Sequence, residues 1–170
     1  MILEVSVRPE NSNDSKAINK VISAAFDHHP HSNQKEQCIV SQLRDNSALD
    51  VSLVAVYEGV IIGHIAFSKV KINGNECSWY GLGPVAVSPV YQNYGVGSKL
   101  IKEGIKAIIE KGAEGCVLLG EPEYYERFGF KASSSLVLDG VPPEYFLVLS
   151  FKKYTHAGKV EYHQAFVDNG

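Results

Sequence analysis

The sequence predicts a mixed α/β (α+β) fold in one domain, and three observations support this class. Segments with the alternating or continuous apolar patterns of strands lie among segments whose apolar residues recur at helical spacing. Three strand patterns follow one another over residues 51–87 with only short turns between them, which indicates an antiparallel meander rather than a doubly wound sheet. The length of 170 residues suits one domain over 1–170, with a core over about 1–151 and a C-terminal extension over 152–170.

The composition excludes several classes of protein. Hydrophobic residues make up 45% and charged residues 21% of the chain, which is typical of a globular protein and not of a disordered one. The net charge of -3 gives no basic excess for nucleic acid, and no apolar stretch reaches the ~20 residues of a membrane helix. The start of the chain lacks the features of a secretory signal, and Cys38, Cys77 and Cys116 are odd in number and widely separated. We therefore expect a cytoplasmic protein with free thiols and with neither a nucleic-acid nor a membrane partner.

The N-terminal half is predicted to hold a strand, two helices and the meander. Residues 1–8 alternate apolar and polar side chains up to Pro9, and Asp14 or Ser15 can cap the helix that follows. The helices are expected over 16–26 and 33–44, because their apolar residues share one face. The meander strands are expected over 51–57, 60–72 and 77–87, with turns at Glu58-Gly59 and Asn73-Gly74-Asn75.

The C-terminal half begins with the clearest helix of the chain. Leu100, Ile101, Ile105, Ile108 and Ile109 recur at helical spacing, and Gly112 is suited to end the helix. The remaining elements are expected to be a buried strand over 116–119, a short helix over 123–128, strands over 130–138 and 146–151, and a marginal strand over 160–167. The glycines and proline of Gly81-Leu82-Gly83-Pro84, inside the third meander strand, indicate a bulge or a close approach by a ligand.

The segment from Val85 to Ser98 passes from a buried strand through a glycine-bearing loop into the long helix. Such a junction points free backbone N–H groups outward, and Gly95 and Gly97 leave room for an anion such as phosphate to reach them. A Walker A loop would need lysine directly after Gly97, where this chain has Ser98, and a dinucleotide fingerprint would need glycine in place of Leu100. The junction therefore fits either an anion site that matches neither nucleotide motif or a tight turn at the start of a helix.

Two motifs give this sequence a family resemblance. The run Gln92-Asn93-Tyr94-Gly95-Val96-Gly97 matches the Gln/Arg-x-x-Gly-x-Gly/Ala pyrophosphate loop of the GNAT superfamily of acyl-CoA-dependent N-acetyltransferases, and the strand Leu82–Val87 before it resembles that family's central strand. Tyr124–Phe130 resembles the family's Tyr-x-x-x-Gly-Phe signature. The two motifs stand in the family's order, and the resemblance covers nearly the whole chain up to about Phe151.

The resemblance implies a mostly antiparallel sheet whose fourth and fifth strands are parallel and splay apart. In the family the pantetheine of acetyl-CoA lies in that gap, bonded to backbone groups such as those of Val85 and Val87, and the pyrophosphate lies on the amides from Gln92 to Ser98. The residues implied for acetyl-CoA binding are Val85, Ala86, Val87, Gln92, Asn93, Tyr94, Gly95, Val96, Gly97, Ser98, Tyr124, Tyr125 and Phe128.

Tyr125 matches the tyrosine of the second signature, which the family uses as a general acid. The resemblance implies that its phenol protonates the departing CoA thiolate, while a backbone N–H near Val87 stabilises the oxyanion. Tyr124, the neighbouring residue, is the alternative candidate for the general acid. Tyr125 could instead be an aromatic residue that packs the short helix against the sheet. Many family members have asparagine where this chain reads Gly120-Glu121-Pro122, which weakens any prediction of side-chain contacts there.

No general base is assigned from the sequence. His64 and Glu76 are candidates, but each also fits a structural or solvated role. His28, His29 and His31 are expected to line the acceptor entrance, because they lack the fourth ligand and spacing of a metal site, so no metal is predicted. Glu36 and Arg44 lie on one helix and fit either substrate contact or a solvated surface.

The predicted function is transfer of an acetyl group from acetyl-CoA to a primary amine of a small-molecule or peptide/protein acceptor, by direct attack. The alternative is a non-catalytic acyl-CoA-binding module on the same fold, and a nucleotide-binding protein is a third class. The sequence identifies neither the acceptor nor the role of residues 154–170. These last residues could either cover an edge strand or contact a second copy in a homodimer.

Overall fold

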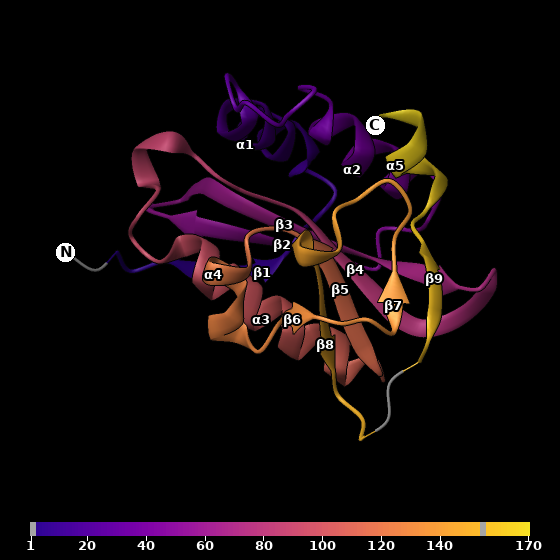
Figure 1. Cartoon of the computed structure of the whole chain (residues 1–170). Coiled ribbons are helices and arrows are strands. Elements are labelled where there is room, and N and C mark those ends of the chain that lie inside the picture. The colour runs from indigo at the N-terminus through magenta and orange to yellow at the C-terminus, as the bar shows by residue number, and fades with distance from the viewer. Residues whose placement is uncertain (1–2, 154–155) are drawn as a thin grey trace.

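A mixed β-sheet with helices on both faces forms the centre of the computed structural model, which describes residues 3–153 and 156–170 (Figure 1). Helices α1, α2 and α5 cover one face of the sheet, and α3 covers the other (Figure 1). This arrangement confirms the predicted fold class. Residues 1–2 of the first expected strand and residues 154–155 of the C-terminal extension lie outside the described residues.

Helices and strands follow one another along the chain in nearly the predicted order. In chain order they are β1 (Ser6–Pro9), α1 (Ser15–Phe26), α2 (Glu36–Asp45), β2 (Val51–Tyr57), β3 (Val60–Ile72), β4 (Asn75–Val87), α3 (Val96–Glu110), β5 (Gly115–Leu119), α4 (Pro122–Tyr125), β6 (Lys131–Ala132), β7 (Leu136–Val137), β8 (Phe146–Ser150), β9 (Gly158–Glu161) and α5 (Gln164–Asp168). Short 3₁₀ turns span Pro89–Tyr91, Glu126–Phe128 and Pro143–Tyr145. The sheet order is β1-β2-β3-β4-β5-β8-β6, and β9 pairs with β3 and β7.

The predicted meander is confirmed, with tight hairpins at both expected turns. Glu58 and Gly59 have φ values of 49° and 78°, and Asn73 and Gly74 have 52° and 76°. Two consecutive residues with positive φ are typical of type I′ turns, whose twist matches that of the paired strands. The turns therefore set the register that carries β4 across the middle of the sheet.

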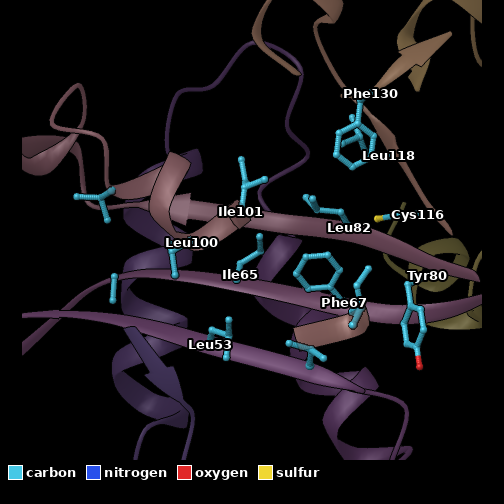
Figure 2. Close-up of a cluster of buried hydrophobic side chains, with 14 of the residues drawn as sticks. Leu53, Ile65, Phe67, Tyr80, Leu82, Leu100, Ile101, Cys116, Leu118 and Phe130 are labelled. Carbon is cyan, nitrogen blue, oxygen red and sulfur yellow. The ribbon is translucent and has the colours of Figure 1, made fainter. Parts of the chain in front are cut away.

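Helix α3 lies directly on the sheet, and Figure 2 shows its Leu100 and Ile101 among side chains of the central strands. Gly104 allows this approach, because a methyl group at that position would lie 2.3 Å from Cε1 of Phe67 on β3. The contact is buried, since Phe67 and Leu100 have no exposed surface. Packing of α3 on β3 thereby fixes the position of the N-terminus of α3 beside the end of β4.

The opposite face is covered by α1. Its Ile18, Val21 and Ile22 pack on three small or β-branched strand residues, Val54 of β2, Ala66 of β3 and Ala86 of β4. The helix begins at Ser15, one residue before the expected start, and Asp14 holds the N-cap position, but the Asp14 carboxylate does not cap the helix. That carboxylate accepts from the Asn11 N–H at 2.8 Å and pairs with Arg8 at 2.7 Å instead.

Two predicted strands are wrong in part. The strand expected over 130–138 is divided into β6 and β7 by a serine run, where Ser133 Oγ accepts from the Ser135 N–H at 3.2 Å and turns the chain locally. The strand expected over 160–167 ends at Glu161 and gives way to α5. His163 Nδ1 caps α5 by accepting from the Ala165 N–H at 2.9 Å, and Ala165 is buried against α2.

Over the described ranges, 3–153 and 156–170, every helix is too short or too polar to cross a membrane.

Candidate active site

Strands β4 and β5 pair over only three positions and then part. The parallel pairs are Trp79 with Gly115, Tyr80 with Cys116 and Gly81 with Val117, after which β4 continues without a β5 partner to Val87. The predicted bulge lies just beyond the last pair. Ile65 and Phe67 of β3 pair with Val85 and Leu82 of β4, so residues 83 and 84 of β4 stand opposite one residue of β3. The predicted splay is therefore present, and it leaves backbone groups on one edge of β4 free.

The N-terminus of α3 presents free backbone amides. Gly95 precedes the helix with φ 83°, a left-handed conformation that glycine adopts readily. The first helical hydrogen bond runs from the Lys99 N–H to the Gly95 carbonyl at 3.0 Å. Within the described part of the chain, the N–H groups of Val96, Gly97 and Ser98 have no backbone acceptor, and the helix dipole adds partial positive charge there. This helix end can bind an anion.

A cavity of about 760 Å³ joins these two features. Its lining comes from the end of α1, the end of β4, the loop before α3, the start of α3 and the region of α4. The predicted residues that line it are Val85, Ala86, Val87, Gln92, Asn93, Gly95, Val96, Gly97, Ser98, Tyr124 and Tyr125. Tyr94 and Phe128 lie outside this lining: Tyr94 is exposed, and the Phe128 ring packs 5.6 Å from that of Tyr124.

The cavity also contains residues that motif matching does not single out. Ala25 and Phe26 reach it from the end of α1, and Tyr91 and Ile101 line it near the α3 loop. Arg127 lies at its edge, where Nε donates to the Tyr124 carbonyl at 2.8 Å and Cζ lies 4.4 Å from the Tyr124 ring centroid. In the sequence, Arg127 could have been noticed because it is the one cationic residue within the aromatic signature Tyr124–Phe130.

Tyr125 lies against the end of β5 in a space that a glycine provides. A methyl group at Gly120 would lie 2.4 Å from Cε2 and 2.9 Å from Cδ2 of the Tyr125 ring. Burial raises the pKa of Tyr125 to about 12, with a smaller contribution from Tyr124. The phenol is therefore protonated at neutral pH and is available as a proton donor inside the cavity.

The acetyltransferase (GNAT) domain family matches residues 6–133 of this chain, which is about three quarters of its length. The chain belongs to the GNAT acetyltransferase family. Among curated relatives, the uncharacterized N-acetyltransferase YhbS of Escherichia coli K12 is 33% identical over 129 residues, covering 75% of this chain and 74% of that protein. YjhQ of the same organism, also called an uncharacterized N-acetyltransferase, is 36% identical over 124 residues, covering 71% of this chain and 66% of that protein.

Two solved GNAT structures resemble the whole chain. A GNAT family acetyltransferase from Brucella melitensis, solved in complex with acetyl-CoA, has a TM-score of 0.87 at 47% identity and covers 96% of this chain and 98% of its own. YhbS from Escherichia coli, solved in complex with CoA, has a TM-score of 0.91 at 30% identity and covers 100% of this chain and 96% of its own. The similarity to YhbS extends over the C-terminal strands and α5.

The glycine beside Tyr125 gives a prediction for this GNAT protein. Gly120→Ala is expected to lower the free energy of unfolding by about 1–3 kcal/mol, because the new methyl group must displace the Tyr125 ring. Gly97→Ala is the matched control, since its methyl group would lie 3.6 Å from the Tyr124 hydroxyl, an ordinary contact. Urea unfolding of both variants checks this, and equal stability would contradict the close packing at Gly120.

The other polar residues singled out in the sequence lie in different places. His29 lines the cavity, whereas His28, His31, His64 and Glu76 are absent from its lining. Glu36 accepts from the Ser32 hydroxyl at 2.7 Å and Arg44 pairs with Glu10 at 2.9 Å, both away from the cavity. Among residues 3–153 and 156–170, no group of three or more His, Cys, Asp or Glu side chains could hold a metal ion.

Proposed function

We propose that this protein transfers the acetyl group of acetyl-CoA to a primary amine of a small-molecule or peptide/protein acceptor, by direct attack in a ternary complex. The observation that carries the proposal is one cavity that joins the free amides of α3, the unpaired edge of β4 and the buried Tyr125 phenol. The complexes of the Brucella melitensis relative with acetyl-CoA and of YhbS with CoA support this choice of cosubstrate.

Acetyl-CoA would bind mainly through the backbone. The pyrophosphate would accept hydrogen bonds from the amides of Val96, Gly97 and Ser98, supported by the loop that begins at Gln92. The pantetheine would lie along β4 at Val85–Val87, where the departure of β5 leaves the strand edge unpaired. Its two amides can then pair with the strand as an added strand does.

The reaction would need two groups around the thioester. A neutral amine attacks the carbonyl carbon, and a backbone N–H near Val87 stabilises the negative charge that develops on the oxygen. When the C–S bond breaks, its electron pair goes to sulfur, and Tyr125 donates its phenolic proton to the thiolate. The raised pKa of Tyr125 keeps that proton in place until the thiolate forms.

The acceptor would approach from the α1 side of the cavity. Ala25 and Phe26 at the end of α1, and His29 in the following loop, line this part of the cavity. We also propose that the protein acts in the cytoplasm as one domain over 1–170. Cys38, Cys77 and Cys116 are free, as a reducing compartment favours, and β9 of the C-terminal extension pairs with β3.

A combined binding and turnover experiment tests this function. Acetyl-CoA is expected to bind in calorimetry while ATP and NAD do not compete equally, because the α3 loop matches neither nucleotide motif. Turnover is then screened across amines, polyamines, amino acids, aminoglycosides and peptides by release of free CoA thiol. Binding without any turnover would favour the non-catalytic acyl-CoA-binding alternative, and equal competition by ATP would contradict the proposed pyrophosphate site.

A further inference from the structure

Arg127 is the one lysine or arginine among the described residues that line the cavity, and none of those residues is an aspartate or glutamate. His29, in the loop after α1, is the other lining residue whose side chain can carry a positive charge. Acetyl-CoA carries a pyrophosphate and, on its ribose, a 3′-phosphate. This monoester bears about 1.5–2 negative charges at neutral pH, as the phosphate of a phosphorylated side chain does. The cavity therefore has one permanent cation for a strongly anionic ligand.

The loop before α3 supplies no positive charge of its own. Residues 88–98 contain neither lysine nor arginine. The GNAT loop motif begins with glutamine or arginine, and in this chain it begins with the neutral Gln92, whose Nε2 donates to the Val87 carbonyl at 3.0 Å. Lys99 follows on α3, but its Nζ donates to the Val5 carbonyl near β1. A cation for the phosphates of acetyl-CoA therefore has to come from another element of the fold.

Arg127 lies in the 3₁₀ turn after α4, one aromatic ring away from the start of α3. Its Cζ is 4.4 Å from the centroid of the Tyr124 ring. The hydroxyl at the far end of that ring would lie 3.6 Å from a methyl group at Gly97, whose amide is proposed to hold the pyrophosphate. In acetyl-CoA, the 3′-phosphate and the pyrophosphate are likewise separated by one ring, the ribose. The guanidinium is therefore placed to meet the 3′-phosphate while the amides of α3 hold the pyrophosphate.

The guanidinium is held in place but is not neutralised. Its Nε donates to the Tyr124 carbonyl at 2.8 Å, and its plane is supported by the ring. Glu123 and Glu126 are close in sequence, but within the described residues neither forms an ion pair with Arg127, and the two terminal nitrogens make no hydrogen bond to the protein. Two terminal nitrogens of one guanidinium match the oxygens of a phosphate, and a side chain held beforehand loses less entropy on binding.

We propose that Arg127 binds the 3′-phosphate of acetyl-CoA through its terminal nitrogens, and that it thereby makes the protein select CoA thioesters over their 3′-dephospho forms. This role rests on the proposed function, in which acetyl-CoA lies in the cavity with its pyrophosphate at α3. Neutral backbone amides then bind the pyrophosphate, and the cation binds the monoester, which carries the higher charge on a single phosphate. Arg127 acts on the affinity for the cosubstrate and takes no part in the transfer of the acetyl group.

The expected size of this effect follows from the exposure of Arg127. The side chain lies at the edge of the cavity and is exposed, so water and salt weaken its attraction for a phosphate. We therefore expect the arginine to change Kd by about five- to tenfold, well below the effect of a fully buried ion pair. The preference for the 3′-phosphate should also shrink as the salt concentration is raised, because the ions screen an exposed pair.

Calorimetry with two ligands and three proteins tests this role. The ligands are acetyl-CoA and acetyl-3′-dephospho-CoA, and the proteins are the wild type, Arg127→Gln and Lys131→Gln, all at low salt. The wild type is expected to bind acetyl-CoA about five- to tenfold more tightly than the dephospho form, and Arg127→Gln to lose this preference by weakening for acetyl-CoA alone. Lys131→Gln is the control, because it removes the same charge at an exposed residue of β6 outside the cavity lining, and it should keep the preference.

The two ligands separate a contact to the 3′-phosphate from every other role of the side chain. If Arg127→Gln weakened both ligands equally, Arg127 would act on the pyrophosphate or on the packing of Tyr124, and the proposal would be overturned. A wild type without any preference for the 3′-phosphate would overturn it as well. A wild type that bound neither ligand would refute the proposed function and this role with it, whereas a preference that persisted in Arg127→Gln would refute this role alone.

Discussion

Glutamate in place of Gly97 is expected to abolish acetyl-CoA binding. The Gly97 amide is one of the free N–H groups at the start of α3, and its Cα faces the cavity between Tyr124 and Val87. A carboxylate there would occupy the proposed pyrophosphate position and oppose its charge. We expect Kd to rise about 100-fold or more, because like charges brought together cost several kcal/mol and each tenfold in Kd is about 1.4 kcal/mol.

Gly97→Ala provides the matched comparison for this variant. Its methyl group would lie 3.6 Å from the Tyr124 hydroxyl and 3.8 Å from Val87 Cγ2, so the helix accepts it without displacement. Calorimetry should therefore give Gly97→Ala a Kd much nearer to that of the wild type than Gly97→Glu has. If folded Gly97→Glu bound acetyl-CoA as tightly as the wild type, the pyrophosphate would have to lie elsewhere.

Tyr125→Phe is expected to lower turnover about 100-fold while leaving the affinity for acetyl-CoA nearly unchanged, because a general acid contributes about this much. The ring, which fills the space at Gly120, is kept, and only the proton donor is removed. Since the pKa of Tyr125 is raised to about 12, the wild-type acid remains protonated as pH rises through the neutral range. The Tyr125 phenol should therefore cause no loss of rate below about pH 10.

The control for this variant is Tyr145→Phe, which makes the same chemical change at an exposed tyrosine outside the cavity. Turnover by release of free CoA thiol and Kd by calorimetry are measured on both proteins. Wild-type turnover in Tyr125→Phe would remove the phenol from the reaction and leave Tyr91 and Tyr124, the other tyrosines that line the cavity, as the candidate donors.

Sequence patterns predict the turns and strand bounds that depend on residues close together in the chain. The positive-φ pairs at Glu58-Gly59 and Asn73-Gly74 follow from their residue types, and the bounds of β2 and β3 agree with the apolar patterns. The splay of β4 is likewise signalled by the glycines around Leu82. The strand expected over 130–138 is wrong in part because alternation continues through a serine run whose side chain turns the backbone.

Other features depend on contacts between distant segments. Residues 164–168 form a helix because Ala165 is buried against Ile39 and Leu43 of α2, which alternation along the segment does not reveal. Hydrogen bonds likewise join Glu10, Arg44, Ser52 and His64, which only the tertiary fold brings together. A histidine in a strand pattern is therefore ambiguous in the sequence, and its hydrogen-bond partners distinguish its possible roles.

The most direct test of the account is to follow the backbone amides of the ¹⁵N-labelled protein by NMR while acetyl-CoA is added. We expect the largest shifts at Val96, Gly97 and Ser98, which would hold the pyrophosphate, and further shifts at Val85 and Val87, along the proposed pantetheine path. Saturating acetyl-CoA that left these five amides unmoved while others shifted would contradict the proposed binding site.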